Sequence, residues 1–139
     1  MKRYLRCFSA LIFLFLFFSC AKSKTHTTYY MSGETKAIYT KNKYCFDGDF
    51  VIYYKSGNKK RAGTFENNKL VGLTSYYLDN ENNTLHRTSL RSNDSLVFNV
   101  IFYPNGTIMK EGYQINQKKI SEWKVYNQIG EVIQVEQNP

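Results

Sequence analysis

The sequence has 139 residues, a formal net charge of +8 and an aromatic fraction of 17%. This length allows one domain with a modest core. Only two prolines and eight glycines argue against a disordered low-complexity chain, and the twelve tyrosines favour β-structure.

The N-terminus reads as a secretory signal. Three basic residues stand among the first seven, and residues 8–18 are almost wholly apolar. A basic start, a short apolar run and a small residue before a cysteine are the layout of such a signal. The run is too short to span a bilayer comfortably, since a span takes about 20 residues. We therefore expect an exported protein in which a signal helix precedes a separate folded domain.

The end of the apolar run, "FFSC", places Ser19 before Cys20. This resembles the lipobox of bacterial lipoproteins, with Phe17 where leucine is usual. The resemblance implies a signal peptide over 1–19, a diacylglycerol on Cys20 and acylation of the new N-terminus, which together anchor the chain to a membrane. Ala21 and the lack of an acidic run after the cysteine favour, by the same analogy, the periplasmic face of the outer membrane. An ordinary secretory signal cleaved nearby, or an uncleaved anchor, is the alternative.

Removal of the signal changes both the charge and the cysteine count. The remaining chain has 16 basic and 11 acidic residues and a net charge of +5, which is not the footprint of a nucleic-acid binder. We expect no nucleic-acid partner. Cys7 leaves with the signal and Cys20 carries lipid, so Cys45 has no partner for an internal disulfide. Such a cysteine is either buried or available for an intermolecular bond, and its strand-like surroundings favour burial.

A tyrosine-based phrase recurs along the rest of the chain. "YYMSG" begins at Tyr29 and "YYKSG" begins at Tyr53, 24 residues later. We call the second tyrosine of each phrase the anchor, and its recurrence at intervals of 23 to 26 residues predicts a repeat architecture. A glycine follows three places after most anchors and four places after the last. The predicted anchors are Tyr30, Tyr54, Tyr77, Tyr103 and Tyr126.

Each copy reads as strands joined by turns. Apolar or alternating stretches of strand length are separated by "KSGN", "ENNK", "PNGT" and "NQKK". Asn105 and Gly106 suit a type I′ hairpin, in which both central residues have positive φ. The predicted fold is all-β, an antiparallel meander of repeated β-hairpins over 29–139 that follows a short tether at 20–28. The predicted strands are 49–55, 59–66, 70–78, 84–90, 96–104, 107–115, 120–127 and 131–136.

Two stretches depart from this regular pattern. Residues 91–95, "RSNDS", form an insertion that lengthens one interval. The N-terminal copy at 29–46 is the least regular, and we expect it to form a partly ordered cap.

The repeat resembles the MORN-repeat variant family, whose phrase combines an aromatic residue, paired tyrosines and a following glycine. Copy 48–72 fits the phrase with Phe50 in the tryptophan place, and 100–130 fits it with Trp123 before the tyrosine. Copy 73–99 is degenerate. Members of this family are often bacterial lipoproteins or proteins labelled antitoxin-like, so the resemblance implies a repeat scaffold with varied partners and no particular chemistry.

The alternation of side chains along a strand predicts two aromatic columns on opposite faces. The anchor tyrosines form one column, and the residues that precede them form the other: Tyr29, Tyr53, Tyr76, Phe102 and Val125. Burial of an aromatic side chain contributes about 1.5–3 kcal/mol, which favours the anchor column as core. The second column is either core or an exposed platform, because exposed aromatic rows mark interaction surfaces. The expected ligand-binding residues are Tyr53, Tyr76, Phe102 and Trp123.

The sequence offers little for catalysis or metal binding. His26 and His86 lack zinc-binding spacing, and no nucleophile elbow or glycine-rich phosphate loop is present. Glu66 and Glu111 stand at matched places in the repeat, which favours solvent exposure over a carboxylate pair. We expect no enzyme activity, no cofactor and no metal.

The expected function is that of a lipid-anchored cell-envelope β-repeat module. It contacts the membrane through the lipid on Cys20 and acts as a protein-interaction adaptor for an envelope protein. The alternative is glycan or small-ligand binding through an exposed aromatic column, and a purely structural role is the third possibility.

Overall fold

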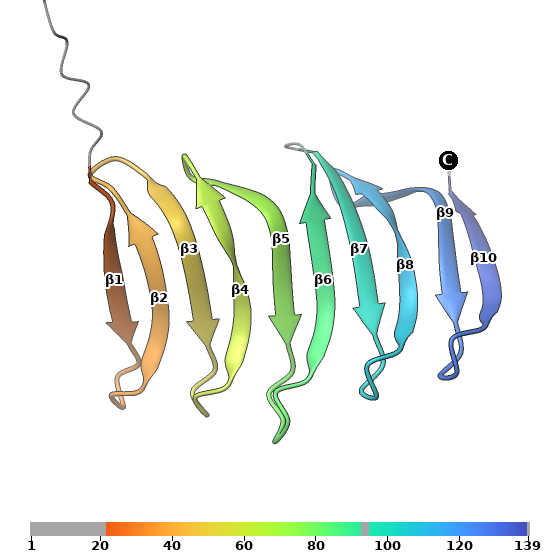
Figure 1. Cartoon of the computed structure of the whole chain (residues 1–139), viewed down its shortest axis with the longest axis horizontal. Helices are drawn as coiled ribbons and strands as arrows, with labels where there is room; N and C mark the ends of the chain where they lie inside the picture. Colours follow the sequence, from red (N-terminus) through yellow and green to blue (C-terminus); the bar gives the residue numbers. More distant parts are fainter. Residues whose placement is uncertain (1–21, 93–94, 139) are drawn as a thin grey trace, which may run out of the picture.

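The computed structural model describes residues 22–92 and 95–138, so the expected signal helix and Cys20 lie outside the described residues. Ten strands form one antiparallel sheet and follow one another along it in chain order, which confirms the all-β meander (Figure 1). Among the described residues, no helix is long and apolar enough to cross a membrane. The strands are β1 (Lys24–Tyr29), β2 (Thr35–Lys41), β3 (Phe46–Tyr53), β4 (Lys59–Glu66), β5 (Lys69–Tyr77), β6 (Leu85–Arg91), β7 (Leu96–Phe102), β8 (Ile108–Ile115), β9 (Lys118–Tyr126) and β10 (Val132–Asn138).

The eight predicted strands correspond to β3–β10, but the N-terminal copy is more regular than predicted. Strands β1 and β2 form a complete hairpin in which Lys24 lies opposite Lys41 and Thr28 opposite Ala37. Residues 24–28, expected in the tether, therefore belong to the sheet. The predicted insertion does separate two strands, since β6 ends at Arg91 and β7 begins at Leu96.

The hairpin turns fix the phase of the repeat. In the β1–β2 turn, the amide of Tyr30 donates to the carbonyl of Glu34, and the amide of Gly33 donates to the carbonyl of Tyr30. The same two bonds close the turns that begin at Tyr54, Tyr103 and Asn127. The β5–β6 turn is longer, because there the amide of residue 78 donates to the carbonyl of residue 84. The structurally equivalent residues are thus Tyr30, Tyr54, Leu78, Tyr103 and Asn127.

Two of the predicted anchors are therefore wrong. Tyr77 and Tyr126 stand one residue before the equivalent places and correspond to Tyr53 instead. Where two aromatic residues stand side by side, the sequence does not show which of them is the equivalent one in each repeat. The hydrogen bonds of the turn do show it. With the corrected phase, Gly130 follows Asn127 by three places, as in the other glycine-containing copies.

The turn types also differ from the prediction. Gly106 has a φ of 86°, but Asn105 does not have positive φ, so this turn is not type I′. The amide of Gly106 donates to the carbonyl of Tyr103, which is the pattern of a type I turn followed by a left-handed glycine. The type I′ φ pattern occurs at the opposite ends of the strands, in the two-residue β4–β5 and β8–β9 turns, whose central residues all have positive φ. These are Asn67 and Asn68, and Asn116 and Gln117.

The sheet is a single layer with two faces, and its buried residues form one column. We call the face that carries Phe50 and Trp123 the core face, and the other the reverse face. Four buried side chains occupy equivalent places on β3, β5, β7 and β9: Phe50, Thr74, Asn99 and Trp123, which are 4%, 4%, 5% and 2% exposed. The column is aromatic at its ends and polar in its two central members.

Tyrosine hydroxyls join neighbouring hairpins. The hydroxyl of Tyr30 donates to the carbonyl of Tyr53 at 2.8 Å, and that of Tyr103 donates to the carbonyl of Tyr126 at 2.8 Å. A third bond of this kind starts from Tyr54 in the second hairpin. Leu78, the equivalent residue of the third hairpin, has no hydroxyl. The corrected anchor series therefore makes the same inter-hairpin bond wherever it carries a tyrosine.

Candidate functional site

The structure divides the predicted aromatic platform between the two faces. Tyr76 lies opposite Arg61, which lies opposite Ile52, so Tyr76 shares the core face with Ile52. Tyr53 follows Ile52 and points to the reverse face. Phe102 is likewise on the reverse face, and Trp123 is on the core face. The prediction of one column was wrong because a phase error of one residue moves a side chain to the other face.

Trp123 is a large side chain that is almost fully buried, at 2% exposure. Its indole lies against the backbone of Gly112, where an added Cβ would stand 2.4 Å from the ring. The indole N–H donates to the carbonyl of Tyr113 at 2.8 Å. The ring is therefore packed inside the fold, and its N–H group has a hydrogen-bond partner there.

Ion pairs hold β10 beside β9, where Glu136 lies opposite Trp123. The carboxylate of Glu136 accepts hydrogen bonds from the ammonium groups of Lys110 at 2.6 Å and Lys119 at 2.8 Å. Both ammonium groups also lie over the ring of Trp123, at 5.6 and 5.1 Å from it. The bonds from Lys110 and Lys119 lower the pKa of Glu136, and the bond with Glu136 raises the pKa of Lys119. These charges are engaged with one another and tie β10 to the sheet.

In the central hairpins the core face is polar. Ser89 lies opposite both Thr74 and Asn99. The hydroxyl of Ser89 donates to Oδ1 of Asn99 at 2.6 Å, and Nδ2 of Asn99 donates to Oε1 of Gln114 at 3.1 Å. This chain of side-chain hydrogen bonds satisfies the buried amide of Asn99. The copy described as degenerate in the sequence is the one that replaces an aromatic core residue by a small polar one.

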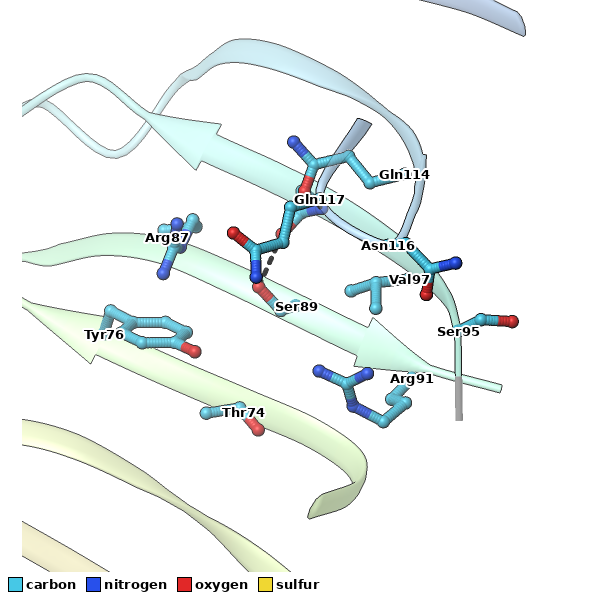
Figure 2. A pocket seen from close by; sticks show the side chains of 11 residues that line it. Thr74, Tyr76, Arg87, Ser89, Arg91, Ser95, Val97, Gln114, Asn116 and Gln117 are labelled. Carbon is cyan, nitrogen blue, oxygen red and sulfur yellow. Dashed lines mark hydrogen bonds between the residues drawn. The ribbon is translucent and has the colours of Figure 1, made fainter. Parts of the chain in front are cut away.

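A pocket of about 290 Å³ opens where these polar side chains replace an aromatic ring (Figure 2). Hydroxyl, amide and guanidinium groups dominate its lining, and no acidic residue is among the lining residues within 22–92 and 95–138. The lining residues are Thr74, Tyr76, Arg87, Ser89, Arg91, Ser95, Val97, Asn99, Gln114, Asn116 and Gln117.

At one side of the pocket, Tyr76 lies between two guanidinium groups. The guanidinium carbon of Arg87 is 4.0 Å from the centre of the Tyr76 ring, and that of Arg61 is 5.1 Å from it. The three residues stand directly opposite one another on β4, β5 and β6. The Nε atoms of both arginines are buried without a hydrogen-bond partner. Within the described ranges, neither arginine makes an ion pair.

On the reverse face, the same strands carry a row of apolar side chains. Leu73, Leu90, Phe98 and Tyr113 lie directly opposite one another across β5, β6, β7 and β8. We call these four residues the central apolar row. Leu73, Leu90 and Tyr113 are 55%, 49% and 45% exposed, and the rings of Phe98 and Tyr113 are 4.8 Å apart. The sequence held a signal for this row, since each member directly precedes or follows a polar core-face residue.

The described residues contain no group of three or more histidine, cysteine or acidic side chains placed to hold a metal ion. Cys45 is half-buried, and its sulfur accepts a hydrogen bond from Nδ2 of Asn42 at 3.2 Å. Comparisons of the chain with protein-family models, with curated proteins and with solved structures find no match.

Proposed function

We propose that this chain is a lipid-anchored, non-catalytic adaptor of the cell envelope, and that it binds another envelope protein through the central apolar row. The observation that carries the proposal is the exposure of Leu73, Leu90 and Tyr113 in one uninterrupted line. Contiguous exposed apolar surface of this kind marks interaction sites in soluble domains. Full burial of each such side chain contributes about 1.5–3 kcal/mol, so a covering partner gains free energy from each member of the row.

The surroundings of the row favour a protein over a bare lipid surface. Beside Phe98 and Tyr113 lies a hollow of about 220 Å³ whose lining includes Glu111, Glu122 and Lys124. An apolar centre with a polar rim of both charge signs is the usual composition of a protein–protein interface. We assign the hollow to an anchoring side chain of the partner.

The membrane anchor and the family remain part of the proposal. They are supported by the resemblance of "FFSC" to a lipobox and of the repeat to MORN-variant proteins. The first strand begins at Lys24, four residues after Cys20. A lipid on that cysteine keeps the sheet close to the membrane, where an integral or lipidated envelope protein can reach it. We place the chain on the periplasmic face of the outer membrane.

Glycan binding through one aromatic column has less support. The four residues expected for it do not share a surface, because Tyr53 and Phe102 lie on the reverse face and Tyr76 and Trp123 on the core face. Trp123 is also too buried to stack on a sugar.

Purification from solubilised membranes tests the adaptor function. The wild-type chain should retain one envelope protein in stoichiometric amount, and Leu90→Ser should lose it. Ile133→Ser is the matched control, because Ile133 is 62% exposed but lies on β10, outside the central apolar row. Equal retention of the protein by both variants would rule out the row as the docking surface.

A further inference from the structure

We propose that the core-face pocket of the central hairpins binds a small anionic saccharide, meaning a sugar ring that carries one carboxylate or one phosphate. The site lies on the face opposite the central apolar row, so it is separate from the proposed adaptor surface. Three properties of the pocket lead to this ligand class: its charge, the type of its hydrogen-bonding groups and the accessibility of its one aromatic ring.

The charge of the pocket selects an anion. Arg87 lines it, none of the lining residues that the structure describes is acidic, and Arg61 stands next to it across Tyr76. Within the described part of the chain, Arg87 has no carboxylate partner and its Nε has no acceptor. A guanidinium group binds carboxylate and phosphate through paired, charge-assisted hydrogen bonds. An anionic group next to Arg87 supplies the acceptor that its buried Nε lacks.

The remaining polar groups match the hydroxyls of a sugar. Sugar hydroxyls donate and accept, and the pocket offers side chains that do both. Because Oε1 of Gln114 accepts from Asn99, the amide nitrogen of Gln114 remains a donor for the ligand. Asn116 and Gln117 add two further amides on the β8–β9 turn. The internal chain from Ser89 through Asn99 to Gln114 fixes these groups before any ligand arrives.

The aromatic ring at the site excludes a ligand that binds by stacking. Among the described lining residues Tyr76 is the only aromatic one, and the guanidinium groups of Arg61 and Arg87 already lie over it. A nucleobase therefore has no open ring face on which to stack. The volume of about 290 Å³ is just below the usual range for small-ligand pockets, about 300–1,000 Å³, which fits a single hydroxylated ring.

Calorimetric titration of the full chain in a neutral detergent tests the site with four probes: glucuronate, glucose 1-phosphate, glucose and inorganic phosphate. Binding of glucuronate or glucose 1-phosphate at least about tenfold tighter than glucose supports the proposal, and the tighter of the two identifies the anionic group. Equal affinity for glucose overturns the anionic part. Inorganic phosphate that binds as well as glucose 1-phosphate overturns the saccharide part, and the absence of binding by all four overturns the whole.

Two variants place the binding in this pocket. Arg87→Gln should weaken the tighter anionic sugar by about tenfold or more, whereas Lys124→Gln removes a positive charge outside the pocket and should change affinity less than about twofold. If Arg87→Gln does not fold, Gln114→Ala takes its place, with an expected loss of about threefold or more. Unchanged affinity in the folded variant shows that the sugar binds elsewhere and overturns the assignment.

Discussion

The hydroxyl of Tyr54 donates a hydrogen bond of 3.0 Å to the backbone carbonyl of Tyr77, on the following hairpin of the sheet. The same bond joins Tyr30 to Tyr53 and Tyr103 to Tyr126. Each bond connects a residue of one turn to the last residue of the corresponding strand in the next repeat. The recurring tyrosine of the sequence is therefore a device that fixes the spacing of neighbouring hairpins.

Tyr54→Phe removes only the hydroxyl of this bond. We expect the free energy of unfolding to fall by about 1 kcal/mol, the usual contribution of one such hydrogen bond. Urea denaturation followed by tyrosine and tryptophan fluorescence measures it. Tyr29→Phe is the control, since Tyr29 is 62% exposed. An equal loss in both variants would show that the Tyr54 hydroxyl has no special role.

Gly112→Ala tests the packing under the indole of Trp123. The added Cβ would stand 2.4 Å from the ring, so the ring or the strand must move, and overpacking of this kind costs about 1–3 kcal/mol. Gly63→Ala is the graded comparison, because its nearest neighbours would be 3.1 Å away. Thermal denaturation should place the Tm of Gly112→Ala below that of Gly63→Ala, and the reverse order would contradict the described geometry.

The carboxylate of Glu136 makes the stability of the last strand dependent on pH. Hydrogen bonds from Lys110 and then Lys119 lower its pKa in the folded state. A group with a lowered folded pKa contributes stability above its unfolded pKa, and this stability is lost as the pH falls through the folded pKa. The wild-type chain should thus lose stability below about pH 4, where ordinary carboxyl groups titrate.

In Glu136→Gln, the part of this acid-dependent loss that belongs to Glu136 should disappear, and the variant should be less stable than the wild type at pH 7. Glu66→Gln, which removes a carboxylate that makes no ion pair in the described part of the chain, should keep the acid-dependent loss. Denaturation curves from pH 3 to pH 7 compare the three proteins. Parallel curves for wild type and Glu136→Gln would argue against the ion-pair account.

Cys20→Ser tests the proposed membrane anchor. Without the thiol no lipid can be attached, so we expect the chain in soluble fractions or as the unprocessed precursor. Intact-mass analysis of membrane and soluble fractions distinguishes these forms. Processed protein that stays in the membrane to the wild-type extent would refute lipid attachment at this residue.

The sequence predicted the meander because its turn signals are local. The asparagine-rich turn at Asn67 and Asn68 and the glycine-containing turn at Gly57 each require backbone conformations that few residues adopt, so their spacing revealed the strands. The phase was harder to predict. Tyr76 and Tyr77 are both aromatic, and only the hydrogen bonds of the longer third turn show that Leu78 is the equivalent of Tyr54.

The candidate sites could not be predicted for a related reason. Thr74 and Asn99 look like surface residues in the sequence, whereas the sheet register puts them in the buried column of Phe50 and Trp123. On the same strands, the residues next to these polar ones point to the reverse face and are apolar. Leu90 is one of them and is exposed. Which face carries the polar side chains depends on the register of the strands, and amino-acid composition does not reveal the register.

Site-specific photo-cross-linking in intact cells tests whether the central apolar row is the docking surface. A photoreactive residue in place of Leu90 should form a covalent adduct with one envelope protein, and the same residue in place of Ile133 should not form it. We expect this contrast because Leu90 lies in the middle of the central apolar row and Ile133 lies outside it. No adduct from Leu90, or the same adduct from both places, would contradict a docking surface at the centre of the reverse face.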